Sequence, residues 1–317
     1  MKLTDFLETQ KETVFSMEIL PPLKGQGVSS IYDTIDSLKE FDPAFIDVTY
    51  HREEFTFKKH PNGLLEKKST KKRPGTVGIC AAIKYKYDIE AIPHLICGGF
   101  SKEETENALI DLDFLGIDNV LALRGDPIKS ERAFTPEPDG HAYTSDLIGQ
   151  ITDMNNGVYI DEELSNPNPS DFCIGVAGYP EKHFEAPNLK VDLKYLKQKI
   201  DMGADYIVTQ MFFNNKHYFD FVDRCRAEGI TVPIIPGLKT ITTQKQLSVL
   251  PRYFHLEIPE DLSDAIEDAK TKEAVKQVGI EWGIQQAKEL MAAKVPCLHY
   301  YTMGRAKTTR AILEQIF

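Results

Sequence analysis

Short runs of apolar and β-branched residues recur along the whole chain, and their regular spacing limits the folds that it can adopt. Eight such runs lie at residues 14–20, 45–50, 77–83, 119–125, 172–178, 205–211, 232–237 and 296–302. Near-continuous apolar runs of this length are typical of parallel strands buried on both faces. Segments between them, such as 29–41, 101–116, 189–204 and 217–229, have helical periodicity, and several end in glycine, as helices often do.

This alternation of strand and helix predicts an α/β fold in which a parallel sheet closes into a (β/α)8 TIM barrel. A doubly wound open sheet is the competing architecture. Barrels of roughly 250 residues or more form one domain, so residues 1–317 are expected to form a single domain. We interpret residues 155–171 as an inserted loop and residues 251–271 as an extra helical excursion before the last strand.

The charge balance excludes two classes of partner. The net charge of −11 argues against a general nucleic-acid binder and against attraction to an anionic membrane surface. No run reaches the roughly 18 apolar residues of a membrane span, and the first residues lack signal-peptide character. We therefore expect a cytoplasmic protein with neither nucleic acid nor membrane as a partner.

Several common functional motifs are missing from the sequence. The five cysteines are far apart and form no metal-ligand spacing, so reduced core residues and no metal are expected. There is no GxxxxGK[ST] loop and no strand-borne GxGxxG, which disfavours Rossmann-type nucleotide binding. The absence of GxSxG and HExxH removes the common hydrolase signals.

Polar side chains follow the predicted strands at their carboxyl ends, where the loops of a barrel build its open face. The residues in such positions are Glu18, Thr49, Arg124, Asp126, Tyr179, Gln210 and Arg305, with His94 in the predicted loop after the third strand. Any strand meets water somewhere, so no single residue among them is diagnostic. Their common position predicts an enzyme site at one mouth.

Glu18 is the most informative of these residues. By strand alternation it shares a face with Val14 and Ser16. The other face, formed by Phe15, Met17 and Ile19, points to the helices. A carboxyl group inside the barrel would have a pKa raised towards neutrality by desolvation, as a general acid requires, if no cation lies close. An internal ion pair with Arg or Lys is an equal alternative.

The other polar residues have ordinary structural alternatives. Asp126 follows a glycine that permits a tight turn, and it could point into the mouth or stabilise the turn. Arg124 could bind a phosphate or pair with a carboxylate. A lone histidine such as His94 is more often structural than catalytic. Gln210 could bond to backbone, and an ordinary solvated rim would explain Tyr179, His183 and Lys199.

The sequence also contains a series of motifs that resembles the methylenetetrahydrofolate reductase family along almost its whole length. The matching segments, in order, are SMEILPP at 16–22, DVTY at 47–50, PHLIC at 93–97, LALRGDP at 121–127, YTSDLI at 143–148, YPEKHFEA at 179–186, DLKYLKQKIDMGAD at 192–205, VTQMFF at 208–213, IIPGL at 234–238 and HYYTMGRA at 299–306. LRGD, YPExH and TQxFF in this order and spacing are specific. The resemblance is to a bacterial-type catalytic barrel alone.

The resemblance implies an oxidoreductase that reduces 5,10-methylenetetrahydrofolate to 5-methyltetrahydrofolate, supplying methyl groups for methionine synthesis. NADH or NADPH would first reduce bound FAD, and folate would then take its place in a ping-pong transfer. Carried over to this sequence, Glu18 would be the general acid and Asp126 would lie near the flavin and the pterin. Gln210, Gln246 and Arg305 would contact folate.

The resemblance also implies a set of residues that hold the flavin and supply positive charge for its pyrophosphate. They are Thr49, His94, Arg124, Gly125, Asp126, Tyr143, Thr144, Tyr179, His183, Ala186, Asp192 and Lys199. A homo-oligomer is expected by resemblance as well. The competing functions are a pterin-binding barrel that transfers a methyl group without flavin, and a non-catalytic flavin or folate sensor.

Overall fold

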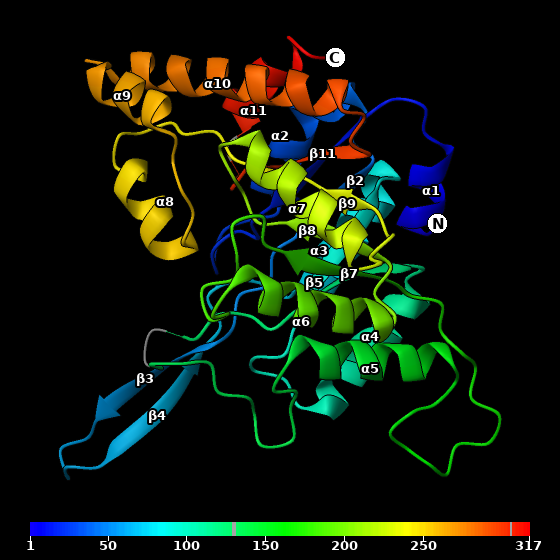
Figure 1. Cartoon of the computed structure of the whole chain (residues 1–317). Helices are drawn as coiled ribbons and strands as arrows, with labels where there is room; N and C mark the ends of the chain where they lie inside the picture. The colour runs from blue at the N-terminus through cyan, green and yellow to red at the C-terminus, as the bar shows by residue number, and fades with distance from the viewer. Residues whose placement is uncertain (129–130, 305) are drawn as a thin grey trace.

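A computed structural model describes residues 1–128, 131–304 and 306–317, and it has the predicted barrel at its centre (Figure 1). The strands of the barrel are β1 (Val14–Ile19), β2 (Phe45–Val48), β5 (Glu90–Ile96), β6 (Asn119–Leu123), β7 (Cys173–Gly178), β8 (Tyr206–Thr209), β9 (Ile234–Ile235), β10 (Gly237–Leu238) and β11 (Cys297–Tyr301). Their order in the sheet is β10-β11-β1-β2-β5-β6-β7-β8-β9, and all neighbouring pairs are parallel.

The barrel closes through a single extended segment that Pro236 divides into β9 and β10. β9 pairs with β8, and β10 pairs with β11. Proline has no N–H to donate to a sheet, but its carbonyl oxygen accepts from His299 N at 3.1 Å. Counted as one, this segment is the seventh strand, so the (β/α)8 prediction is confirmed.

The helices pack around the outside of this barrel, apart from α1, α8 and α9. They are α2 (Ser29–Asp36) with a 3-10 turn at Lys39–Phe41, α3 (Thr76–Tyr87), α4 (Lys102–Phe114), α5 (Thr144–Asn155), α6 (Leu189–Asp201), α7 (Asn215–Ala227), α10 (Lys272–Ala292) and α11 (Ala306–Leu313). Glycines in the left-handed region follow α4, α6 and α7, at Gly116, Gly203 and Gly229. Glycine adopts this conformation without a steric cost, and helices commonly end there.

The prediction of the third strand is wrong. Residues 77–83 lie within α3, where Thr76, Ile79, Cys80 and Ile83 form one buried stripe at helical spacing. The third strand is instead β5, which carries His94. Proline in a run of residues argues against a central strand because it lacks the N–H donor, and Pro93 hid β5 for this reason.

Residues of each strand alternate between the barrel interior and the helices, as strand geometry requires. On β1, Phe15, Met17 and Ile19 belong to the apolar cluster beneath the helices. Val14 packs instead against an inner cluster, and the hydrogen bonds of Ser16 reach Cys297 and His299 across the neighbouring strand. The predicted division of β1 into two faces is therefore confirmed.

Helix α1 (Leu3–Thr9) covers the amino end of the barrel. Leu3 and Leu7 are buried in the inner cluster with Phe45, Ile92 and Tyr206. The backbone N–H of Leu3 also donates to Asn119 Oδ1 at 2.7 Å. One end of the barrel is thereby filled with apolar side chains, which leaves polar groups for the other end.

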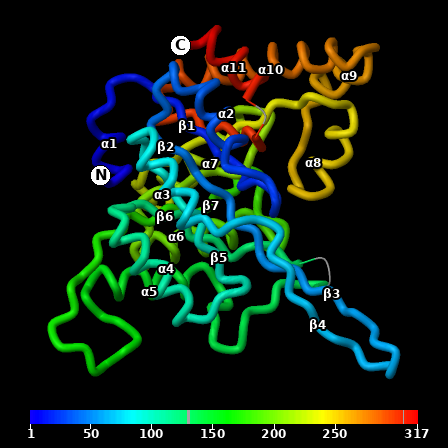
Figure 2. Tube along the Cα trace, turned by 180° about the vertical axis from the view of Figure 1, so that it is seen from behind, coloured from blue at the N-terminus to red at the C-terminus, as the bar shows by residue number. Residues whose placement is uncertain are grey.

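Three segments lie outside the barrel. β3 (Glu54–Lys59) and β4 (Leu65–Thr70) form an antiparallel hairpin that projects from the body (Figure 2). The sequence does not predict this hairpin, because its strands carry lysines and glutamates instead of an apolar run. Residues 157–172 contain neither helix nor strand, and α8 (Gln246–Phe254) and α9 (Glu260–Asp268) precede α10.

The five cysteines are all buried and free. Burial raises the pKa of the Cys297 thiol to about 12, which keeps that side chain protonated at neutral pH. Among the described helices, none has the length and hydropathy that a membrane span requires.

Gly237 offers a test of barrel closure. A Cβ atom there would lie 2.1 Å from the Thr209 carbonyl oxygen and 2.6 Å from the Tyr301 ring, so Gly237→Ala should lower apparent stability in urea by about 3 kcal/mol. Gly78→Ala is the control, because nothing lies within 4 Å of a Cβ atom in that exposed turn of α3. It should raise stability by about 0.5–1 kcal/mol. Equal midpoints for Gly237→Ala and the unaltered protein would contradict the closure described here.

Candidate active site

Glu18 lies near the carboxyl end of β1, inside the mouth of the barrel. Thr49 Oγ1 donates to Glu18 Oε1 at 2.9 Å and is also 3.1 Å from the Ile19 carbonyl oxygen. The backbone carbonyl of Glu18 accepts from Thr302 Oγ1 at 2.7 Å. Thr302 thus holds the backbone of Glu18, and Thr49, expected near the flavin, contacts its carboxyl group directly.

A buried histidine faces the other oxygen of this carboxyl group. His94 Nε2 is 3.6 Å from Glu18 Oε2, and the imidazole is 4% exposed. His94 therefore lies in β5 within the barrel wall, and its predicted position in a loop is wrong because the third strand was misplaced. The basic partner of Glu18 that the structure describes is this histidine, whereas sequence analysis considered Arg or Lys.

Sequence analysis assigned no role to two further members of this cluster. Asp47 Oδ2 lies 3.8 Å from His94 Nε2 and 3.6 Å from His299 Nε2, and Asp47 is 1% exposed. The signal for Asp47 was present in FIDVTY, because alternation places Phe45, Asp47 and Thr49 on one face. His299 lies on β11, where Ser16 Oγ contacts its Nδ1 at 2.9 Å.

The two histidines differ in the direction of their pKa shifts. Burial disfavours the charged form of both imidazoles. For His94 this effect is outweighed by Asp47 and Glu18, whose negative charges raise its pKa. For His299 burial dominates and lowers the pKa. His94 is therefore the better proton carrier of the two.

The loop after β6 brings Arg124, Gly125 and Asp126 to the mouth. Gly125 has φ +84°, and a Cβ atom there would lie 3.2 Å from Ile96, so the tight turn predicted at this glycine is present. Arg124 Nη1 pairs with Glu185 Oε2 at 2.7 Å. Asp126 is exposed and within electrostatic range of Arg124 and of the buried Tyr179 hydroxyl.

The loop after β7 and helix α6 supply more of the expected residues. The ring of Tyr179 meets that of His183 edge to face at 4.7 Å, and His183 N donates to Asp192 Oδ2 at 2.8 Å. Lys199 Nζ donates to the Ala177 carbonyl oxygen at 2.8 Å. Ala186 is buried in the same loop.

Basic side chains gather where these two loops meet, together with two carboxylates. His183 is within electrostatic range of Arg124, Lys199, Asp192 and Glu185, and burial lowers its pKa. Burial also lowers the pKa of Lys199 to about 8, against the effect of Asp192. An anion bound here would restore the charged form of both side chains.

Tyr143 and Thr144 lie apart from these contacts, at the start of α5. Tyr143 is 63% exposed, and its backbone N–H donates to Asp146 Oδ2 at 3.1 Å. Their role toward a cofactor stays a prediction.

The residues expected to contact folate are dispersed. Gln210 Oε1 accepts from Met211 N at 2.9 Å, at the end of β8. Gln246 Oε1 accepts from the backbone N–H groups of Thr242 and Thr243 at 2.8 and 3.0 Å. Arg305 lies outside the described residues.

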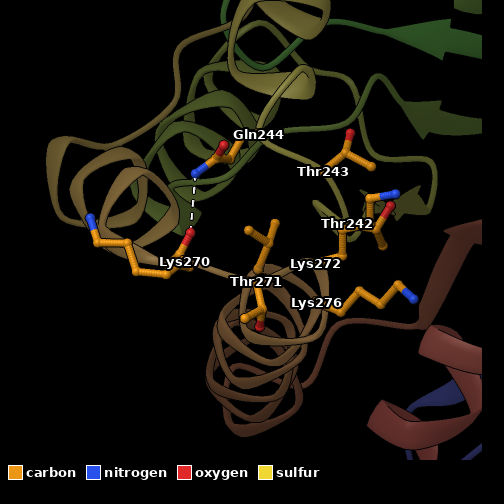
Figure 3. A pocket seen from close by; sticks show the side chains of 9 residues that line it. Thr242, Thr243, Gln244, Lys270, Thr271, Lys272 and Lys276 are labelled. Atoms are coloured by element: carbon orange, nitrogen blue, oxygen red, sulfur yellow. Dashed lines mark hydrogen bonds between the residues drawn. The ribbon is translucent and has the colours of Figure 1, made fainter.

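Thr242 and Thr243 also line a separate hollow of about 290 Å³ at the start of α10 (Figure 3). Its other lining residues are Gln244, Ala269, Lys270, Thr271, Lys272, Val275 and Lys276. Gln244 Nε2 donates across it to the Ala269 carbonyl oxygen at 3.2 Å. Among the described residues, none of those predicted for the active site lines this hollow.

Comparisons with known proteins agree along the whole length of the chain. Residues 2–317 match the family model described as methylenetetrahydrofolate reductase. The chain is 32% identical to the Salmonella typhimurium 5,10-methylenetetrahydrofolate reductase, with 98% of this chain and 92% of that protein covered. It is also 32% identical to methylenetetrahydrofolate reductase 1 of Schizosaccharomyces pombe, of which it covers 48%. The chain thus spans about half the length of that fungal relative.

A solved structure with the same fold is that of a Clostridium thermocellum protein, which binds two copies of 5-methyl-5,6,7,8-tetrahydrofolic acid. The TM-score is 0.58 at 15% identity, covering 99% of this chain and 98% of the other. At this identity the likeness concerns the fold.

The pKa of Lys199 can be measured directly. In a ¹³C NMR titration of the lysine side chains, Lys199 should titrate near pH 8, whereas exposed lysines titrate near 10.4. Lys199→Met assigns the resonance by its disappearance. A midpoint above 10 for that resonance would contradict the buried environment described here.

Proposed function

This chain belongs to the methylenetetrahydrofolate reductase family, and we propose that it reduces 5,10-methylenetetrahydrofolate to 5-methyltetrahydrofolate with NADH or NADPH and bound FAD. The observation that carries the proposal is the position of Glu18. Its carboxyl group lies inside the barrel mouth with Thr49 on one oxygen and His94 beside the other. A site of this kind provides an acid where a substrate enters.

In the proposed reaction Glu18 acts as the general acid. The methylene bridge of the folate opens when one carbon–nitrogen bond breaks, and the departing nitrogen takes a proton. Glu18 donates that proton, and the remaining iminium carbon is then able to accept hydride. Thr49 orients the carboxyl group for this transfer, and Thr302 fixes the backbone of Glu18.

The residues at the β6 and β7 loops fit the pyrophosphate of FAD. Arg124, His183 and Lys199 supply donors and positive charge, and Gly125 lets the backbone approach closely. Glu185 pairs with Arg124 in this structure. A bound phosphate would take the place of the Glu185 carboxylate as the anionic partner of Arg124. FAD, when bound, carries hydride from the nicotinamide to the folate.

Asp126 has a separate proposed role. It is exposed at the mouth and follows the turn at Gly125, so its carboxylate is available to both the flavin and the pterin. A negative charge there disfavours further negative charge on the reduced flavin and so favours hydride release. Gln210, Gln246 and Arg305 are proposed to contact folate, and Gln246 would do so through its amide nitrogen because its oxygen is occupied.

Two other functions share parts of this site. The Clostridium thermocellum protein of the same fold binds methyltetrahydrofolate, which supports a folate site in a barrel of this kind but does not require flavin. A methyltransferase or a non-catalytic sensor would not need both Glu18 and the basic residues at the β6 and β7 loops. Bound flavin and turnover separate the three functions.

Glu18→Gln tests the acid. The purified protein should absorb in the flavin region, lose that band with NADH or NADPH without oxygen, and regain it with methylenetetrahydrofolate. In Glu18→Gln the nicotinamide step should keep its rate, whereas the folate step should slow by about 10²–10⁴-fold. Stopped-flow absorbance measures both steps.

Glu8→Gln, an exposed carboxylate on α1 at the opposite end of the barrel, is the matched control and should leave both steps unchanged. A colourless protein that cannot be reconstituted with FAD would overturn the flavin proposal and favour the methyltransferase.

The affinity for FAD should depend on pH through Lys199. With a pKa of about 8, this lysine is charged below pH 8 and loses its charge above it, so FAD binding should be tightest below pH 8 and weaken above. Lys199→Met should weaken binding by about 10–100-fold at pH 7, the worth of one hydrogen bond to a charged group. The difference from the unaltered protein should shrink above pH 8.

Flavin fluorescence titrations of the FAD-free protein measure these affinities. Lys197→Met is the control, since Lys197 lies on the same helix and pairs with Asp201 at the surface. An equal effect of both substitutions, or a difference that does not vary with pH, would refute the role of Lys199.

A further inference from the structure

A buried carboxylate beneath Glu18 has no assigned role. Both oxygens of Asp47 are buried and form no hydrogen bond with any residue that the structure describes, and the same holds for His94 Nε2 and His299 Nε2. Burying a carboxylate without a partner costs roughly several kcal/mol of folding free energy, because the charge loses its hydration. An apolar residue at this position would avoid that cost. Two imidazoles lie within 4 Å of Asp47, and His94, whose pKa is raised, is the one that can compensate its charge.

One nitrogen atom in this cluster faces two carboxylates. His94 Nε2 is 3.6 Å from Glu18 Oε2 and 3.8 Å from Asp47 Oδ2. The three side chains come from adjacent strands, because β1 pairs with β2 at Glu18 and Asp47, and β2 pairs with β5. A proton on His94 Nε2 is therefore placed between the proposed acid and a carboxylate that is 1% exposed.

We propose that Asp47 is a positioning residue that keeps His94 protonated, so that His94 can return a proton to Glu18 after each turnover. This inference rests on the proposed function and deepens it. When Glu18 has given its proton to the folate nitrogen, the N–H bond of His94 breaks and an O–H bond forms on Glu18. His94 becomes neutral, Asp47 keeps its charge, and solvent at the mouth supplies the one proton that the overall reaction consumes.

His299 does not compete for this role. Its other nitrogen contacts Ser16 Oγ, its ring stacks on Phe45 at 5.6 Å, and its lowered pKa leaves it neutral at pH 7. The negative charge of Asp47 thus acts chiefly on His94. The titratable groups that face His94, Glu18 and Asp47 from the surrounding elements are His51, Cys80, Tyr206, Cys297, His299 and Tyr301.

The direction of the pH effect follows from the charge of Asp47. A neighbouring carboxylate stabilises the imidazolium, so its removal lowers the pKa of His94. Below that lowered pKa the histidine is still protonated and the folate step proceeds. Above it the step slows, so Asp47→Asn should move the basic limb of the folate step to lower pH.

Asp47→Asn keeps the shape of the side chain and removes its charge. Stopped-flow measurements should show a folate step that is near the unaltered rate at pH 6 and at least 10-fold slower at pH 8. Reduction by NADH or NADPH should be unchanged at both values. In a His94→Gln background, where the carrier is gone, Asp47→Asn should have no further effect on the pH profile.

Asp205→Asn is the control, because Asp205 is a partly buried carboxylate at the amino end of the barrel that accepts from Ile174 N at 2.7 Å. Its substitution should leave the pH profile of the folate step in place. A uniform loss of rate in Asp47→Asn at all pH values, or an equal loss in both steps, would mean that Asp47 is merely structural and would overturn the proposal.

A second measurement needs neither activity nor a variant that folds well. In an NMR titration of the FAD-free, unaltered protein, the His94 imidazole should titrate above 6.5, and a value below 6.5 would overturn the proposal. Failure of the proposed function is distinguishable from failure of the role of Asp47. If the proposed function fails, the unaltered protein shows no folate-dependent return of the flavin band, whatever the pKa of His94.

Discussion

The site depends on the register with which β1 pairs with its two neighbours. This register places Glu18 beside Asp47 on one side and beside Tyr301 on the other, and Ser16 beside His299. Because parallel strands alternate in and out together, Glu18, Asp47 and Tyr301 enter the barrel at one level, and Ser16 and His299 enter it at the level nearer the amino end. A slip of β1 by one residue would turn Ser16 and Glu18 towards the helices. The acid, its histidine and the buried carboxylate are therefore consequences of one set of backbone hydrogen bonds.

The barrel interior has an apolar half at its amino end and a charged half at its mouth. Burial of the apolar half offsets the cost of desolvating the charged half. At the amino end, α1 and the strands bury an apolar cluster that includes Leu7, Ile92 and Tyr206. Burial of this kind stabilises the barrel by about 25 cal/mol for each Å² removed from water. At the mouth the same strands carry Glu18, Asp47 and two histidines, whose desolvation opposes folding. The charged side chains are therefore concentrated at the mouth of the barrel, where loops follow the strands.

The sequence predicted the barrel because most of its strands are continuous apolar runs with glycine-ended helices between them. It failed at α3, whose β-branched residues imitate a strand, and at β5, where Pro93 breaks the apparent run. Alternation correctly placed Glu18, but Asp47 and His299 gained meaning only when β1, β2, β5 and β11 were brought together. Their contacts join residues far apart in the chain, which local periodicity does not report.

The covered amino end also bears on the order of events during turnover. Since α1 packs into that end, a ligand of the barrel interior exchanges through the mouth. In the proposed reaction the nicotinamide cofactor and the folate need the same surface there, so one would have to depart before the next arrives. Clearance of the mouth would then limit throughput even when the chemical step is fast. For such a barrel the loops around the mouth would govern speed as much as the acid within it.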